Sequence, residues 1–134
     1  MITDYGSGID QVVDEKGVIW LGGSYRDLCD MPEPVRKTFG FALGLAQNGV
    51  PYPDAKTLSG YRPALIELIE DDDGDTYRAI YTARYADVVY VLHCFKKKST
   101  SGRNLPKRDK ETIEARLAEM RRIEADKVGR EGKN

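Results

Sequence analysis

The segment ALIELIEDDDGDTYRAIYTARYADVVYVLHCF, residues 64–95, contains the strongest structural pattern in the chain. It divides into three runs rich in apolar, aromatic and β-branched residues, at 64–69, 76–83 and 88–95, with short polar connections between them. Such runs are typical of strands, and short connections join antiparallel neighbours. The acidic, glycine-containing segment Glu70–Asp75 suits a tight turn. We therefore predict a three-stranded antiparallel meander.

The residues before this meander predict one strand and two helices. Val18-Ile-Trp-Leu21 is a short apolar run that ends at two glycines, as in a buried strand. Ser24-x-x-Asp27 resembles a capping box, and it predicts a short helix over residues 25–29. A second capping box, Asp30-x-x-Glu33, precedes a run of helical apolar spacing, which predicts a helix over residues 32–48.

The residues after the meander predict one further helix. It begins near Pro106, and its apolar stripe consists of Ile113, Leu117, Met120 and Ile123. The order β-α-α-β-β-β-α predicts an α+β fold, with helices packed on one face of a small antiparallel sheet and a C-terminal helix. We expect one domain over residues 17–126, a polar N-terminal extension over residues 1–16, and a frayed tail over residues 127–134.

Length and composition limit the classes of protein to consider. The chain has 134 residues, 40% hydrophobic and 32% charged, which is typical of one globular domain. No apolar run approaches the ~20 residues of a membrane span, and the N-terminus lacks the features of a signal peptide. Two isolated cysteines and a single histidine make a Cys/His zinc site unexpected. We therefore expect a cytoplasmic protein with no metal or cofactor.

Positive charge is concentrated in the last third of the chain. Residues 1–95 contain 8 Lys/Arg and 15 Asp/Glu, whereas residues 96–134 contain 13 Lys/Arg and 7 Asp/Glu. The densest stretch, residues 96–110, has seven basic residues and one acid. Such a patch on a mildly acidic protein favours binding to a polyanion or to an acidic partner surface. The alternative is a solvated basic loop.

Several short motifs, taken in their order along the chain, resemble the RelE/ParE toxin superfamily, in particular its phage-derived, HigB-like branch. They cover about residues 17–125, and the most characteristic are Lys56-x-Leu-x-Gly60, Tyr77-Arg-Ala-Ile-Tyr81 and Leu92-His-x-Phe-x-Lys-Lys98. The resemblance implies a RelE-like fold and a toxin of a type II toxin–antitoxin system. Many relatives cleave mRNA on the ribosome without a metal ion, and others poison DNA gyrase. Relatives are neutralised by a cognate antitoxin, often one with a helix-turn-helix DNA-binding domain.

Metal-free cleavage of RNA uses the neighbouring 2′-OH as the nucleophile, and cations around the phosphate stabilise the charged intermediate. Arg78 matches the arginine with which relatives bind the scissile phosphate, and Lys97 and Lys98 match the basic pair at the end of the last strand. An alternative for Arg78 is an ion pair with Glu67 on the neighbouring strand. The alternative for the two lysines is a solvated strand end.

His93 is the one side chain whose ordinary pKa lies near neutrality, so it is a candidate general acid or base. Strand alternation places it on one face with Phe95 and Lys97, and Lys96 on the other. The alternative is a half-buried histidine that only orients the sheet. A weaker, RNA-binding role is predicted for five further basic residues: Lys56, Lys96, Arg103, Lys107 and Arg108.

One departure from the family pattern affects the functional interpretation. Many RNA-cleaving relatives have basic residues on the strand that corresponds to residues 64–70, where this chain has none. Three interpretations remain open: a ribosome-dependent mRNA endoribonuclease, a gyrase-poisoning toxin, and a catalytically degenerate RNA- or protein-binding relative. In each toxin interpretation, the basic stretch 96–110 is the expected docking surface for acidic segments of the antitoxin.

Overall fold

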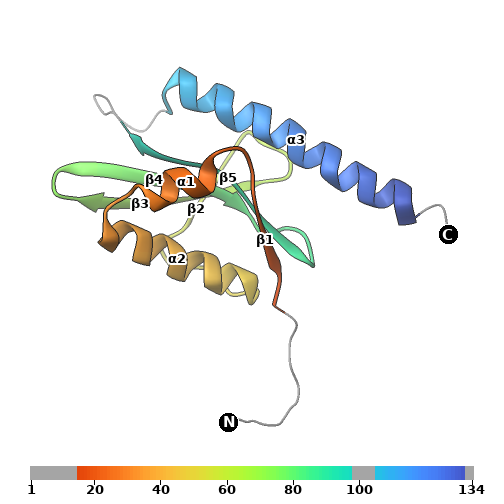
Figure 1. Cartoon of the computed structure of the whole chain (residues 1–134), viewed down its shortest axis with the longest axis horizontal. Helices are drawn as coiled ribbons and strands as arrows, with labels where there is room; N and C mark the ends of the chain where they lie inside the picture. Colours follow the sequence, from red (N-terminus) through yellow and green to blue (C-terminus); the bar gives the residue numbers. More distant parts are fainter. Residues whose placement is uncertain (1–14, 98–104, 132–134) are drawn as a thin grey trace, which may run out of the picture.

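The computed structural model describes residues 15–97 and 105–131, and it confirms the α+β fold class (Figure 1). The predicted strand and two helices at the start of the chain are present as β1 (Gly17–Trp20), α1 (Ser24–Cys29) and α2 (Glu33–Gln47). The rest of the described chain forms β2 (Lys56–Leu58), β3 (Leu65–Asp72), β4 (Asp75–Thr82), β5 (Val88–Lys97) and α3 (Lys107–Glu131).

The five strands form one sheet in the order β1-β5-β4-β3-β2. The antiparallel meander β3-β4-β5 is confirmed. The sheet as a whole is mixed, because β1 pairs with β5 in parallel, so the predicted wholly antiparallel sheet was wrong at this edge. The segment between β1 and β5, which includes α1, α2 and the strands β2 to β4, provides the long connection that a parallel pair requires. The other edge strand, β2, has only three residues, too few for a periodic pattern to predict.

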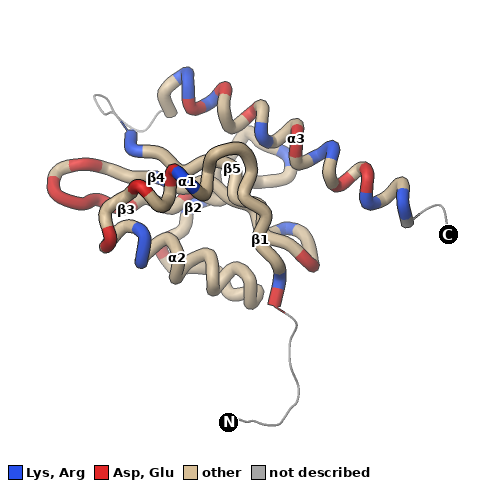
Figure 2. The backbone as a smooth tube through the Cα atoms, viewed as in Figure 1, with Lys and Arg blue, Asp and Glu red and all other residues tan. Residues whose placement is uncertain are grey.

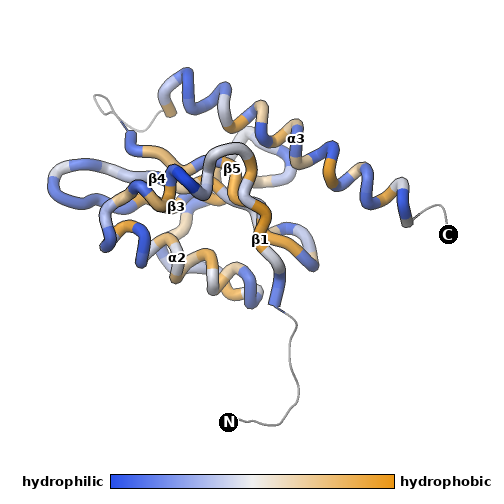
Figure 3. The backbone as a smooth tube through the Cα atoms, viewed as in Figure 1, coloured by the Kyte–Doolittle hydropathy of each residue, from blue (hydrophilic) through white to orange (hydrophobic). Residues whose placement is uncertain are grey.

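The turn between β3 and β4 explains the acidic segment in the middle of the meander. Asp73 and Gly74 both have positive φ angles, 51° and 84°, as in the two-residue turns that match the twist of a hairpin. Aspartate tolerates this conformation and glycine adopts it without strain. The acidic side chains therefore gather at the hydrophilic tip of the hairpin (Figures 2 and 3).

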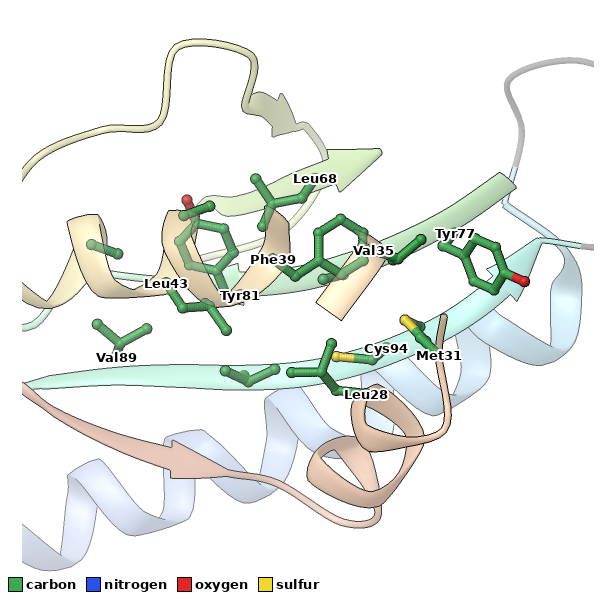
Figure 4. Packing of buried hydrophobic residues seen from close by; sticks show 14 residues of the cluster. Leu28, Met31, Val35, Phe39, Leu43, Leu68, Tyr77, Tyr81, Val89 and Cys94 are labelled. Atoms are coloured by element: carbon green, nitrogen blue, oxygen red, sulfur yellow. The ribbon is translucent and has the colours of Figure 1, made fainter. Parts of the chain in front are cut away.

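Helices cover both faces of the sheet. Val35, Phe39 and Leu43 of α2 pack on one face against residues such as Leu68 and Tyr81 (Figure 4). On the other face, α3 contributes Ile113, Leu117 and Met120 to a second cluster with residues of β3, β4 and β5. The prediction that the helices pack on one face was therefore wrong. The physical reason lies in β5, whose residues 88–95 are all buried and must be covered on both sides.

The C-terminal half of α3 is fixed by polar contacts as well as by its apolar stripe. The hydroxyl of Tyr90 donates to Glu124 at 2.6 Å, and the ammonium of Lys127 donates to the same carboxylate at 3.0 Å. The helix continues to Glu131, past the end that was predicted near residue 126. The predicted N-terminal extension lies almost wholly outside the described residues. None of the described helices has the length and apolar character that crossing a membrane would require.

A β-bulge in β5 determines which side chains face α3. Ile80 pairs with His93 but Tyr81 pairs with Val91, so Leu92 is an extra residue on β5. Beyond this bulge, His93 lies opposite Ile80, a residue of the cluster that α3 covers. Phe95 and Lys97 follow at intervals of two and therefore share that side of the sheet.

Candidate functional site

A pocket of about 740 Å³ lies beside the last residues of β5, between α1 and the first half of α3. Its strand side consists of His93, Cys94, Phe95 and Lys96, together with Tyr77 of β4. The α1 side contributes Asp27, Asp30 and Met31. The α3 side contributes Pro106, Arg108, Asp109, Thr112 and Arg116.

His93 and Asp109 form the central contact of this pocket. The Nε2 atom of His93 lies 2.8 Å from Oδ1 of Asp109, which is in the first turn of α3. The imidazole stacks on the ring of Phe95, with centroids 4.5 Å apart. If Nε2 carries the proton and donates it to the carboxylate, Nδ1 is left as an acceptor. Nδ1 is buried and has no hydrogen-bond partner in the described part of the chain.

The pKa of His93 is lower than its ordinary value of 6.5. Burial is the largest cause, because it disfavours the charged imidazolium, and Arg116 adds a smaller effect in the same direction. The hydrogen bond and the charge of Asp109 act against this shift without reversing it. His93 is therefore neutral at pH 7 and can accept a proton.

Three cationic side chains line the pocket around this pair: Lys96, Arg108 and Arg116. Arg116 is held in place by the carbonyl of Leu92, the bulge residue, to which its Nη1 donates at 2.8 Å. Its guanidinium lies against Gly22, where an added Cβ would come within 2.5 Å of Nε. Gly22 also has a positive φ of 54°, so two constraints favour glycine there.

Arg78 occupies a different position. Its Nη1 lies 2.6 Å from Oε2 of Glu67 on the neighbouring strand, and both side chains are more than 90% buried. This is the ion pair that the sequence analysis weighed against a phosphate-binding role. Arg78 shares the α3 side of the sheet with His93 and pairs with Phe95, but it does not line the pocket.

The other predicted site residues are dispersed. Lys97 shares the His93 side of β5 and is buried, while Lys96 lies on the opposite side, as strand alternation predicted. Lys56 is exposed on β2, and Lys107 is exposed at the start of α3; neither lines the pocket. Lys98 and Arg103 lie outside the described residues. The pocket thus brings together three predicted residues, His93, Lys96 and Arg108.

Sequence reasoning missed the acidic residues of the pocket and Arg116. Asp109 is the one acid in the basic stretch 96–110, and this was the available signal. Asp27 was interpreted only as a capping residue, and Arg116 lies outside the apolar stripe that was predicted for the last helix. Their positions depend on how α1 and α3 pack on the sheet. Local sequence patterns do not predict this packing.

The thiol of Cys94 also lines the pocket, but it is not suited to nucleophilic chemistry. The side chain is 1% exposed, and burial raises its pKa to about 12. Because the thiolate is the reactive form of cysteine, this thiol is inert at neutral pH. Its role is to pack against the α2 side of the sheet.

Breaking the Glu67–Arg78 pair tests whether Arg78 serves the structure. Glu67→Gln leaves a buried guanidinium without its counter-charge, so we expect the free energy of unfolding to fall by about 3 kcal/mol. Urea unfolding monitored by circular dichroism measures the free energy of unfolding of each variant. Glu33→Gln, in the exposed Glu33–Lys37 pair, is the matched control and should change stability by less than ~0.5 kcal/mol. A loss no larger for Glu67→Gln than for the control would contradict a structural role.

The lowered pKa of His93 makes stability depend on pH. Near pH 6 the unfolded chain binds more protons than the folded one, so the free energy of unfolding falls as the pH drops below about 6.5. Because His93 is the only histidine, the stability difference between wild type and His93→Gln isolates this effect. Urea unfolding at pH 7.5, 6.5 and 5.5 should show wild type losing stability relative to the variant. If the stability difference between wild type and His93→Gln did not change with pH, or if wild type gained relative stability at low pH, the lowered pKa of His93 would be contradicted.

Comparison with known proteins identifies the family. Residues 26–118, more than two thirds of the chain, match the model of the family described as phage derived protein Gp49-like (DUF891). No curated protein and no solved structure matches the chain significantly. The matched range includes most of α1, all of α2, the whole sheet except β1, and the part of α3 that lines the pocket. The chain therefore belongs to the phage-derived Gp49-like family, a family of toxins from toxin–antitoxin systems.

Proposed function

We propose that this protein is a toxin that cleaves mRNA on the ribosome, with His93 as the general base. The observation that carries the proposal is the unpaired Nδ1 of a neutral histidine that is hydrogen-bonded to Asp109, in a pocket that Arg108 and Arg116 also line. Membership of a toxin family supports the same conclusion and implies an antitoxin partner.

In the proposed reaction, RNA binding uncovers Nδ1 of His93, which is buried in the free protein, and Nδ1 then removes the proton from a ribose 2′-OH. The 2′-oxygen then bonds to the adjacent phosphorus, and the bond from phosphorus to the 5′-oxygen breaks. Arg108 and Arg116 are placed to stabilise the negative charge that develops on the phosphate oxygens. The leaving 5′-oxygen takes a proton from water, so the products are a 2′,3′-cyclic phosphate and a 5′-hydroxyl end.

Asp109 is a positioning residue in this proposal. Its hydrogen bond holds the proton on Nε2 and so keeps Nδ1 available as the acceptor. The same bond raises the pKa of His93 against the effect of burial, which makes the imidazole a better base than burial alone would leave it.

Induced expression in a bacterium, with mapping of 5′-hydroxyl transcript ends, tests the proposal. Wild type should produce new ends inside translated regions, and His93→Gln should reduce them by about 10²-fold or more, the usual contribution of a general base. Lys37→Ala, at an exposed position on α2, is the control and should cleave like wild type. Circular dichroism of each purified variant confirms that it is folded.

Three outcomes would contradict the proposal. Growth arrest without new RNA ends would indicate a toxin that acts on a protein, such as gyrase. New ends that persist unchanged in His93→Gln would place the active site elsewhere. The absence of both arrest and new ends, with folded protein present, would indicate a degenerate relative.

A further inference from the structure

The pocket runs along the outer edge of β5. Four consecutive residues, His93 to Lys96, line it, although alternate residues of a strand point to opposite faces. A hollow over one face would be lined by every second residue. The hollow therefore lies beside the backbone edge and has access to both sides of the strand.

This edge lacks a neighbouring strand in the described chain. The pairing of β1 with β5 ends at Trp20 and Val91, and β1 itself ends there. On β5 the next carbonyl, that of Leu92, accepts a hydrogen bond from the side chain of Arg116 instead of from a strand. An open strand edge can accept an added strand through main-chain hydrogen bonds.

The two walls of the pocket differ in charge. On one side lie Asp27 of α1 and Asp30, which follows α1, and Leu28 of α1 belongs to the core cluster on the α2 side of the sheet. On the other side, α3 contributes Arg108, Arg116 and Asp109, and Asp109 is hydrogen-bonded to His93. No ion pair joins Asp27, Asp30 or Arg108 to another described residue.

We propose that the outer edge of β5 over residues 93–96 accepts an extended peptide strand whose side chains alternate between basic and acidic. Successive side chains of such a strand point to opposite faces. Its basic residues would meet Asp27 and Asp30, and its acidic residues would meet Arg108 and Arg116. The four lining residues span about 10 Å at ~3.3 Å per residue, so at least four residues of the peptide can pair.

The charges along this edge suit a peptide of mixed charge. The pocket contains three cations and three carboxylates, which suits a ligand with both signs of charge better than a polyanion. The proposal shares the pocket with the proposed nuclease site but does not depend on RNA cleavage. A bound strand would lie beside His93 and exclude RNA, so a partner with such a segment would inhibit the nuclease.

Two synthetic octapeptides with blocked termini test the proposal. One alternates lysine and glutamate; the other has the same composition, with four lysines followed by four glutamates. Titration into the isotope-labelled full chain, followed by NMR at 0.15 M salt, measures affinity and location. The alternating peptide should bind at least tenfold more tightly, shift the amide signals of residues 93–96 and slow their hydrogen exchange.

Charge reversal of Asp27 and Asp30 tests whether the acidic side of the pocket contributes to binding of the alternating peptide. Asp27→Lys with Asp30→Lys should weaken binding of the alternating peptide by about tenfold. Asp54→Lys with Asp126→Lys makes the same change of charge at exposed positions outside the pocket and should leave binding unchanged. Equal affinity for both peptides, shifts away from β5, or no binding at millimolar peptide would overturn the proposal. Because no RNA is present, these outcomes are independent of the nuclease test.

Discussion

Ile113, Leu117 and Met120 hold α3 on the sheet, and every charged group that α3 contributes to the pocket depends on that packing. All three side chains are at most 4% exposed. Full burial of such a side chain contributes roughly 1.5–3 kcal/mol, whereas an exposed ion pair contributes about 0–1 kcal/mol. The apolar stripe therefore contributes more than the salt bridges to holding the helix on the sheet. The polar residues Arg108, Asp109 and Thr112 on its N-terminal turns line the pocket.

Strand β5 connects the fold to the site. Its residues 88–95 are buried on both sides, which locks it between the α2 layer and α3. The bulge at Leu92 comes where the pairing with β1 stops, and the strand continues with one open edge. The same irregularity provides the carbonyl that holds Arg116. The bulge at Leu92 therefore has two effects on the pocket: it lies where the open edge of β5 begins, and its carbonyl holds Arg116.

The sequence contained most of the fold but little of the site. The meander followed from three apolar runs and an Asp-Gly turn, because strand patterns and turn residues are local signals. The parallel pairing of β1 and the placement of α3 on the second face depend on contacts between distant segments. The apolar run of β5 predicted a strand, but the need to cover both of its faces became clear only from the burial of residues 88–95.

The site residues also differ in whether a local sequence pattern could predict them. His93, Lys96 and Arg108 were predicted, and all three line the pocket. Arg78 was predicted with two alternatives, and the ion pair with Glu67 is the one that the structure contains. Asp109 acquires its role only because the first turn of α3 lies over β5. A carboxylate in a basic stretch gives no sign of this in sequence alone.

The protonation of the two ring nitrogens of His93 is the quantity on which the account depends most. Nitrogen-15 chemical shifts of the imidazole, measured at pH 7 in the full chain, report it directly. The account predicts a neutral ring with the proton on Nε2 and none on Nδ1, and a loss of this preference in Asp109→Asn. A proton on Nδ1, or a charged imidazolium at pH 7, would contradict the account.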